Sequence, residues 1–433
     1  MKRSLLLLLT LPSCLLADRL VTPPSLFHDP KFAREFVGSY GILSDVEPRV
    51  SSDEQAFLET VRQLFEQSKF QEAEASVLQF IQDTEHPKDR KKEPAEVSPA
   101  MYFVLGNLEF QAGRTEQARK RFLQAIDEFP RFRRAYTNLG YLHISKNEPK
   151  LALPRFQRAV ELGESSSRVY GLIGYCHLDA KNPLAAENAY RLAYLLDPSA
   201  RDWKLGLAQS LLLEEKYPEA ASMIGTLIEE NPNDKQLWLQ QANAFLAMER
   251  KEDAIVNLEI LRRKGIADTG NLDLLGNLHM DAGQPQLALI SYQEAIRKSD
   301  RPDVDRTLKS VRILTDHGFP EDAGKLLDTL RTAGKRVKFT TADETRMRLA
   351  EVRVARALEK PEKVGTLLEE LAADDPANSE VLLELARHKD LQAKETDNGA
   401  PRAKLVQEAR TNYQLALRDE KVAYEANLGL GQL

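Results

Sequence analysis

The sequence has few cysteines, few aromatic residues and little net charge. Its 433 residues include only two cysteines, Cys14 and Cys176, and aromatic residues make up 7% of the chain. Two cysteines are too few for a fold held together by disulfides. The formal net charge of −6 is small for this length, so the chain has no overall electrostatic attraction to nucleic acid or to an anionic membrane. We therefore expect no nucleic-acid partner.

The sequence also lacks the motifs that mark common catalytic and metal sites. It contains no Gly-rich phosphate loop, no His-Glu-x-x-His, no cysteine pair at metal spacing and no Gly-x-Ser-x-Gly. An enzyme needs a nucleophile, an acid, a base or metal ligands that converge on a pocket. We therefore expect a protein without catalysis, cofactor or metal. The alternative is an enzyme or enzyme subunit whose pocket is formed by residues 18–52 against the rest of the chain.

The N-terminus has the features of an export signal. It reads MKRSLLLLLTLPSCLLADRL, with a basic start at Lys2 and Arg3, a leucine-rich core and the small Ala17 before Asp18. This order is typical of a secretory signal peptide, and the apolar core is shorter than the roughly 20 residues that a membrane anchor needs. The sequence therefore predicts removal of residues 1–17 and export to the periplasm or cell envelope.

A second interpretation of this segment stays open. Leu11-Pro12-Ser13-Cys14 resembles a bacterial lipobox, in which the cysteine becomes a lipidated N-terminus. Pro12 is unusual in such a motif, and Leu15 is bulky for the third residue before a cut after Ala17. Lipidation at Cys14 would make the protein a membrane-anchored lipoprotein, and only then do we expect a membrane partner.

A 34-residue period governs the middle of the chain. It begins at residue 99 and runs through six units to residue 302 without a gap. Small residues occupy the eighth and twentieth positions, a larger side chain occupies the twenty-fourth, and three units close with proline. The eighth position holds Gly106, Gly140, Gly174, Ala208, Ala242 and Gly276; the twentieth holds Ala118, Ala152, Ala186, Ala220, Ala254 and Ala288; the twenty-fourth holds Phe122, Phe156, Tyr190, Ile224, Leu258 and Tyr292.

Each unit is expected to be a pair of antiparallel helices. Small residues at two positions allow the helices to approach closely, and the larger side chain fills the space beside them. Proline ends the second helix because it has no N–H to continue the hydrogen-bond ladder. A single helix pair cannot bury both of its apolar faces, so the units must stack.

The pattern resembles that of the tetratricopeptide repeat (TPR) family. The resemblance implies an all-α fold, a right-handed α-solenoid or superhelix of about ten helix-turn-helix units. It also implies a concave groove, lined by the first helix of each unit, that binds protein segments. In this family the eleventh position often holds a packed tyrosine. Here it holds His143, His177 and His279, which we interpret as packing residues because ligands one repeat apart, about 10 Å, cannot share a metal.

Less regular segments flank the six units. We divide the chain into a signal peptide (1–17), a non-repeat segment (18–52), a first TPR-like unit (53–87), a charged loop (88–98), the six regular units (99–302), and degenerate units with a C-terminal capping helix (303–433). Residues 18–52 are either a flexible tether or a segment that packs on the first unit through its aromatic side chains.

The groove positions implied by the resemblance give a set of candidate partner-binding residues. These are Phe103, Asn107, Arg134, Tyr141, Arg168 and Tyr175, then Gln209, Asn243 and Asn277, then Arg312, Arg353 and Arg387. The first group joins aromatic platforms to guanidinium groups and would suit an acidic or aromatic peptide. The amides can both donate and accept hydrogen bonds to a peptide backbone. The alternative is that all of these are solvated residues on an exposed helix face.

We therefore predict a non-catalytic protein-protein interaction scaffold of the cell envelope that binds partner peptide segments in its groove. The alternative function is a lipid-anchored envelope assembly factor that serves secretion, pilus or outer-membrane biogenesis.

Overall fold

The computed structural model describes residues 45–88, 93–335 and 337–433, and these residues form 21 helices, α2 to α22, with no strand. The chain divides into two compact units, Met1–Arg250 and Lys251–Leu433, here called the N-terminal and C-terminal units. The predicted signal peptide, the lipidation site Cys14 and most of segment 18–52 lie outside the described residues. Among the described helices, none combines the length and the apolar character needed to cross a membrane.

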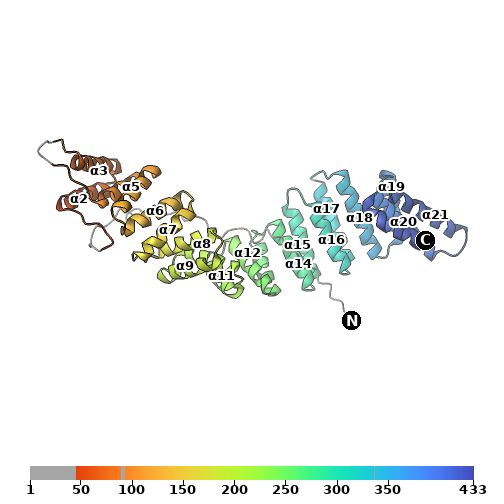
Figure 1. Cartoon of the computed structure of the whole chain (residues 1–433). Helices are drawn as coiled ribbons and strands as arrows, with labels where there is room; N and C mark the ends of the chain where they lie inside the picture. The colour runs from red at the N-terminus through yellow and green to blue at the C-terminus, as the bar shows by residue number, and fades with distance from the viewer. Residues whose placement is uncertain (1–44, 89–92, 336) are drawn as a thin grey trace. The chain divides into compact units, whose positions relative to one another are not determined.

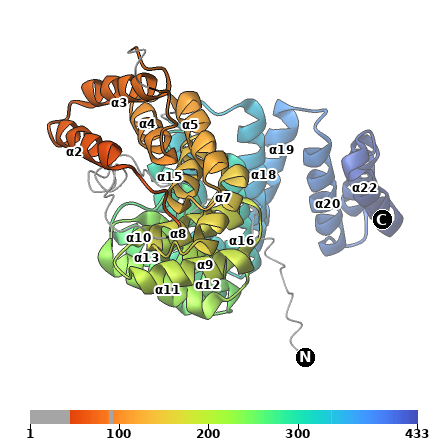
Figure 2. The ribbon, with the colours of Figure 1, turned by 60° about the vertical axis from the view of Figure 1, so that its left-hand side comes forward.

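The N-terminal unit is a stack of helices that follow one another in chain order (Figures 1 and 2). Its helices are α2 (Ser52–Glu66), α3 (Phe70–Glu85), α4 (Pro99–Gln111), α5 (Thr115–Glu128), α6 (Arg133–Ser145), α7 (Pro149–Glu161), α8 (Ser167–Asp179), α9 (Pro183–Leu196), α10 (Arg201–Leu213), α11 (Tyr217–Glu230) and α12 (Lys235–Ala247).

The C-terminal unit has the same construction. Its helices are α13 (Lys251–Arg263), α14 (Thr269–Asp281), α15 (Pro285–Lys298), α16 (Val304–Asp316), α17 (Pro320–Gly334), α18 (Thr341–Ala357), α19 (Pro361–Asp374), α20 (Ser379–Glu395), α21 (Ala400–Ala416) and α22 (Glu420–Gln432). The prediction of an all-α fold made of about ten helix-turn-helix units, typical of a TPR superhelix, is confirmed.

Glycines on the first helices accommodate aromatic rings of the second helices. A Cβ atom placed on Gly140 would lie 2.6 Å from the ring of Phe156, and one on Gly174 would lie 2.7 Å from the ring of Tyr190. Both distances are shorter than any real Cβ contact, so the close packing requires glycine there. The alanines at the twentieth position are fully buried beside these rings. The periodic small residues therefore set the distance between the helices, as the sequence predicts.

The turn between the two helices of a pair uses left-handed backbone at a fixed position. Gly113, Asn147, Lys181, Glu215 and Glu249 all have φ between 56° and 77°. Glycine adopts this conformation without strain, and asparagine tolerates it. For the lysine and the two glutamates the conformation is unfavourable, so the packing of the two helices, rather than local preference, imposes the turn in those repeats.

The last helix, α22, was expected to cap the apolar end of the chain. Its inner face buries Val422, Ala426 and Gly429. Its outer face carries Tyr424 and Leu428, whose exposed fractions are 79% and 54%. A terminal capping repeat normally presents a polar outer face. The helix α22 therefore covers the preceding helix pair, but its own outer face still exposes apolar side chains.

Candidate peptide-binding groove

The candidate groove residues all lie on the first helices of their pairs. In the N-terminal unit α4 carries Phe103 and Asn107, α6 carries Arg134 and Tyr141, α8 carries Arg168 and Tyr175, α10 carries Gln209 and α12 carries Asn243. In the C-terminal unit α14, α16, α18 and α20 carry Asn277, Arg312, Arg353 and Arg387 in turn.

The structure places two of the candidates inside the packing rather than on the surface. Phe103 and Asn107 each have an exposed fraction of 1%. The ring of Phe103 lies 4.9 Å, centroid to centroid, from that of Phe132, and Asn107 Oδ1 accepts a hydrogen bond of 2.8 Å from Asn138 Nδ2. Every residue of α4 from Ala100 to Phe110 is buried. Both side chains are thus structural, because α4 is covered on all sides rather than along one face.

The next two aromatic candidates are also buried, and only the polar candidates that follow them are half-buried. Tyr141 and Tyr175 are each 6% exposed, and the ring of Tyr141 meets that of Phe156 edge-on at 5.5 Å. Replacing either tyrosine by alanine would therefore disturb the core as well as the surface. Arg168, Gln209 and Asn243 are half-buried. These three are the groove candidates of this unit whose substitution tests the surface without opening the core.

Arg134 is paired within the chain, through a residue that the sequence did not single out. Its Nε donates to Glu47 Oε2 at 3.0 Å, and its guanidinium group lies 5.5 Å from the centre of the Phe103 ring. Burial raises the pKa of Glu47 in spite of the nearby Arg134 and Arg133. Glu47 stands 87 residues before Arg134 and outside the repeats, so no periodic pattern could reveal the contact.

In the C-terminal unit, a half-buried carboxyl group accompanies the amide candidate on α14. Asn277 Oδ1 accepts a hydrogen bond of 2.7 Å from the Tyr292 hydroxyl, which fixes the amide in place. One turn earlier, Asp273 Oδ2 lies 3.4 Å from Arg306 Nη1. Burial raises the pKa of Asp273 to about 6, although Arg306 opposes the shift. Apart from its place on a groove-facing helix, no pattern in the sequence marks Asp273.

Asp273→Asn is expected to stabilise the C-terminal unit near neutral pH and to lose this advantage in acid. Because the folded state holds the Asp273 proton more tightly than the unfolded state, wild-type stability falls as pH rises from about 4 to about 6 and stays lower above that window. Asparagine avoids the buried charge, so the gain should reach about 2 kcal/mol at neutral pH. Thermal unfolding across this pH range measures it. Asp328→Asn, at an exposed site on α17, is the control; equal effects of the two substitutions would contradict the expectation.

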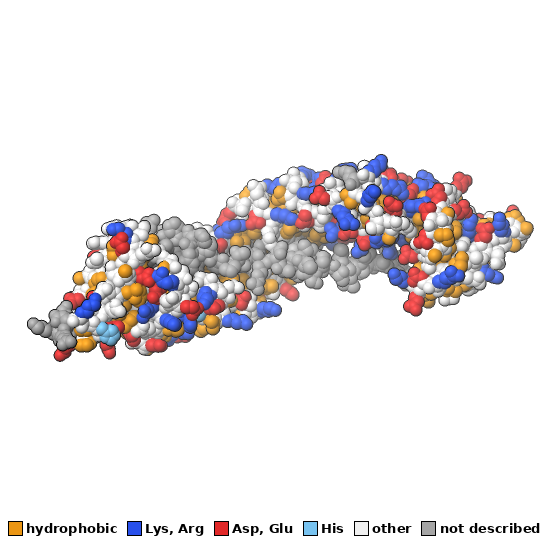
Figure 3. Space-filling model, turned by 90° about the horizontal axis from the view of Figure 1, so that it is seen from above, with side chains coloured by type: hydrophobic (Ala, Val, Ile, Leu, Met, Phe, Trp, Pro, Cys, Tyr) orange, Lys and Arg blue, Asp and Glu red, His pale blue; other side chains and the backbone are white. Residues whose placement is uncertain are grey.

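The arginine row of the C-terminal unit is largely neutralised by acidic neighbours. Arg312 Nε lies 3.2 Å from Asp316 Oδ2, and Arg387 Nη1 lies 2.8 Å from Glu384 Oε1. Arg353 is exposed on α18, and no ion pair joins it to another described residue. Such exposed pairs add little stability, but they cancel charge. On the faces of both units in view, positive and negative side chains are intermixed (Figure 3). The row is therefore a weaker anion-binding surface than its sequence suggests.

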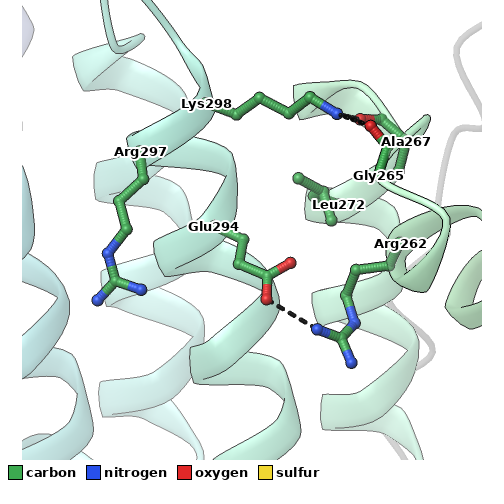
Figure 4. A pocket seen from close by; sticks show the side chains of 7 residues that line it. All are labelled: Arg262, Gly265, Ala267, Leu272, Glu294, Arg297 and Lys298. Carbon is green, nitrogen blue, oxygen red and sulfur yellow. Dashed lines mark hydrogen bonds and ion pairs between the residues drawn. The ribbon is translucent and has the colours of Figure 1, made fainter.

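One cavity of about 300 Å³ lies in the C-terminal unit, between the end of α13 and the end of α15. Figure 4 shows Lys298 reaching to the carbonyl oxygens of Gly265 and Ala267, while Arg262 faces Glu294 at 2.7 Å. These cations already have partners inside the chain, and none of the predicted groove residues lines the cavity. Among the described residues, no cluster of three or more His, Cys, Asp or Glu side chains could hold a metal ion.

Two of the three histidines at the eleventh position, His143 and His279, connect the two helices of a pair, whereas His177 is half-buried. His143 Nδ1 lies 2.8 Å from Glu148 Oε2, and His279 Nδ1 lies 2.9 Å from Gln284 Oε1. Both rings are buried, and each joins the end of a first helix to the start of the second.

Cys176 is expected to be unreactive in the folded protein. It is buried on α8, and burial raises the pKa of its thiol to about 12, so almost no thiolate forms at about pH 8. In a Cys14→Ser variant, where Cys176 is the remaining thiol, we expect Ellman's reagent to react only after denaturation. Rapid stoichiometric reaction of the native protein would show that this site is open.

Comparison with known proteins supports the assignment of these repeats. A family model described as Tetratricopeptide repeat matches four overlapping stretches, 103–167, 141–202, 172–234 and 205–265. The sequence has no significant match among curated proteins.

Solved structures of the same kind are similar at low sequence identity. A tetratricopeptide repeat protein from Parabacteroides merdae ATCC 43184 is 15% identical over 65% of this chain and 100% of its own, with a TM-score of 0.36. The C-terminal part of a TPR repeat-containing protein from Cytophaga hutchinsonii is 15% identical over 66% of this chain and 98% of its own, with a TM-score of 0.38. YrrB, described as a TPR protein with an unusual peptide-binding site, is 18% identical over 45% of this chain and 91% of its own, with a TM-score of 0.36.

The assignment rests on the family match and not on these structures, whose TM-scores are all below 0.4. The matched stretches join into one run, residues 103–265, which contains most of the regular 34-residue units. Residues 103–265 are therefore tetratricopeptide repeats.

Proposed function

We propose that this protein is a non-catalytic scaffold of the cell envelope that binds peptide segments of partner proteins along the first helices of its repeats. Tetratricopeptide repeat proteins generally serve as scaffolds for protein-protein interaction, and repeat arrays use extended surfaces for binding. The carrying observation is that Tyr175, Gln209 and Asn243 occupy one register position on the successive first helices α8, α10 and α12. The two amides are half-buried and can donate and accept, as an extended peptide backbone requires.

Affinity capture with surface variants tests this proposal. The double variant Gln209→Ala, Asn243→Ala removes both amides without opening the core, so partner recovery should fall about tenfold or more, since each lost hydrogen bond costs about 1 kcal/mol. Leu195→Ala is the matched control, because Leu195 lies 75% exposed on the second helix α9. Unchanged recovery with the amide variant, or equal losses with both, would count against groove binding.

The envelope location rests on the N-terminal sequence. We propose simple export after cleavage at Ala17, with lipidation of Cys14 and a role in secretion, pilus or outer-membrane biogenesis as the alternative. Intact-mass measurement of the mature protein separates the two. A chain that starts at Asp18 without modification supports simple export, a lipidated Cys14 supports the anchored form, and an unprocessed Met1 start would contradict both.

A further inference from the structure

The segment before the first helix pair places a single carboxylate, that of Glu47, against Arg134, a predicted groove residue of the N-terminal unit. Residues 46–50, here called the Glu47 strap, lead into α2 and lie against the beginning of α6. Pro48 is buried, and Val50 packs against the core around α4. The strap therefore has a defined place on the repeats, beside Arg134, one of the predicted partner-binding residues.

Two neighbouring arginines hold the strap. Glu47 Oε2 accepts from Arg134 Nε at 3.0 Å, and Glu47 Oε1 lies 3.6 Å from Arg133 Nη2. The backbone N–H of Arg133 donates to the carbonyl oxygen of Val46 at 3.2 Å. Arg133 is the first residue of α6, where the helix dipole also favours a negative charge. The site thus contacts a carboxylate and the peptide group next to it.

The fit between the carboxylate and the arginines is incomplete. Glu47 Oε1 and Arg133 Nε are both buried and have no hydrogen-bond partner among the described residues. A guanidinium group can give a carboxylate two parallel hydrogen bonds, and Arg133 gives none of them here. The carboxylate of Glu164 also acts on Glu47 unfavourably. Consistent with this, burial outweighs both arginines in setting the raised pKa of Glu47. A ligand with better geometry could therefore replace the strap.

We propose that Arg133 and Arg134 form a binding site for an acidic peptide side chain, and that Glu47 fills this site in cis until an acidic partner segment displaces it. This inference rests on the proposed groove function, to which it adds the ligand class and a means of regulation. The ligand is an acidic peptide rather than a free acid, because the Arg133 N–H recognises the carbonyl group that precedes the carboxylate residue. The Phe103 ring beneath Arg134 holds the guanidinium group in place.

The chain's own sequence supplies the probe. A fluorescein-labelled peptide of residues 44–52 is titrated with the full chain, and binding is followed by fluorescence anisotropy. Because the strap occupies the site in the wild type, only the open fraction can bind, so Glu47→Ala should bind the probe at least about tenfold more tightly. A probe with Glu47→Gln should bind weakly to both proteins, and Arg134→Ala in the Glu47→Ala background should abolish the gain.

A matched control and a folding check complete the experiment. Glu72→Ala removes an exposed carboxylate on α3 whose partner, Lys69, is 3.7 Å away and also exposed; it should bind the probe as the wild type does. Thermal melts establish that each variant is folded. Equal affinity of wild type and Glu47→Ala, or a gain that survives Arg134→Ala, overturns the inference. The probe assay does not need the partner protein. If it fails, the proposed groove function is still tested separately by affinity capture with the Gln209→Ala, Asn243→Ala variant.

Discussion

Replacing Gly206 by alanine is expected to lower the free energy of unfolding of the N-terminal unit by about 3 kcal/mol. The Tyr190 ring of α9 lies between glycines of two successive first helices, Gly174 on α8 and Gly206 on α10. A Cβ on Gly206 would lie 2.2 Å from Tyr190 Cζ. The ring is 1% exposed and has no space to move away, because Gly174 is also in close contact with it. Overpacking a rigid core in this way costs about 1–3 kcal/mol, and the tight confinement favours the upper end.

Urea unfolding followed by circular dichroism measures this effect. Gly324→Ala is the control, since a Cβ at this helical position in α17 would meet only Val354, at 3.9 Å; its higher helix propensity should leave stability unchanged or raise it by up to about 1 kcal/mol. In a Tyr190→Leu background the Gly206→Ala cost should shrink, because the clashing ring is gone. A Gly206→Ala protein as stable as the wild type would contradict the described packing.

Glu54→Ala is expected to weaken the attachment of the first helix pair to the remaining repeats. Glu54 Oε2 accepts the Ser51 N–H at 2.7 Å in a capping box at the start of α2, and Oε1 accepts the Ser98 N–H at 2.6 Å just before α4. The side chain is buried, so its loss leaves two backbone donors without their acceptor. Ser51 is exposed and Ser98 is half-buried, so water can replace part of the loss. A hydrogen bond to a charged group contributes about 1.5–3 kcal/mol, and we expect a local loss of about 2 kcal/mol in α2 and α3.

Hydrogen exchange of α2 and α3 measures this loss directly, as protection lowered by about thirtyfold there with α8 and α9 unchanged. Asp53→Ala is the matched control, because Asp53 is exposed in the same helical turn. If Asp53→Ala lowers protection equally, the hydrogen bonds of Glu54 to Ser51 and Ser98 do not account for the stability of α2 and α3. Exchange that rises equally in all helices would instead indicate global unfolding.

The architecture was predictable because its determinants are local and recur every 34 residues. Small residues such as Gly140 and Ala152 reveal the close approach of two helices without any knowledge of their partners. The period also places the turns at Lys181, Glu215 and Glu249, where the residue type alone gives no turn signal. The pattern identifies prolines that end second helices but not those that begin them. Pro149, Pro183 and Pro285 stand in the first turn of α7, α9 and α15, where proline is favoured because its missing N–H has no partner in the helix.

The candidate site was predictable only as far as its helix face. The register places Phe103 and Asn107 on a first helix, but burial depends on what covers that helix, and α4 is covered on all sides. Contacts between segments that are distant in the sequence do not follow the 34-residue period and cannot be predicted from it. Glu47 reaches Arg134 from outside the repeats, and Glu384 lies between Arg356 and Arg387, pairing with both. The sequence therefore overestimates the free charge on the predicted surface, and the role of the half-buried amides of α10 and α12 stays a prediction.

Site-specific photo-crosslinking tests the groove most directly. A benzoylphenylalanine residue is placed at position 209 on α10 in one protein and at position 195 on α9 in another, and both are irradiated in cells that express the chain. If the first helices form the binding surface, the adduct with a partner protein forms from position 209 and not from position 195. An adduct that forms from position 195 alone, or equally from both positions, would contradict peptide binding in the groove.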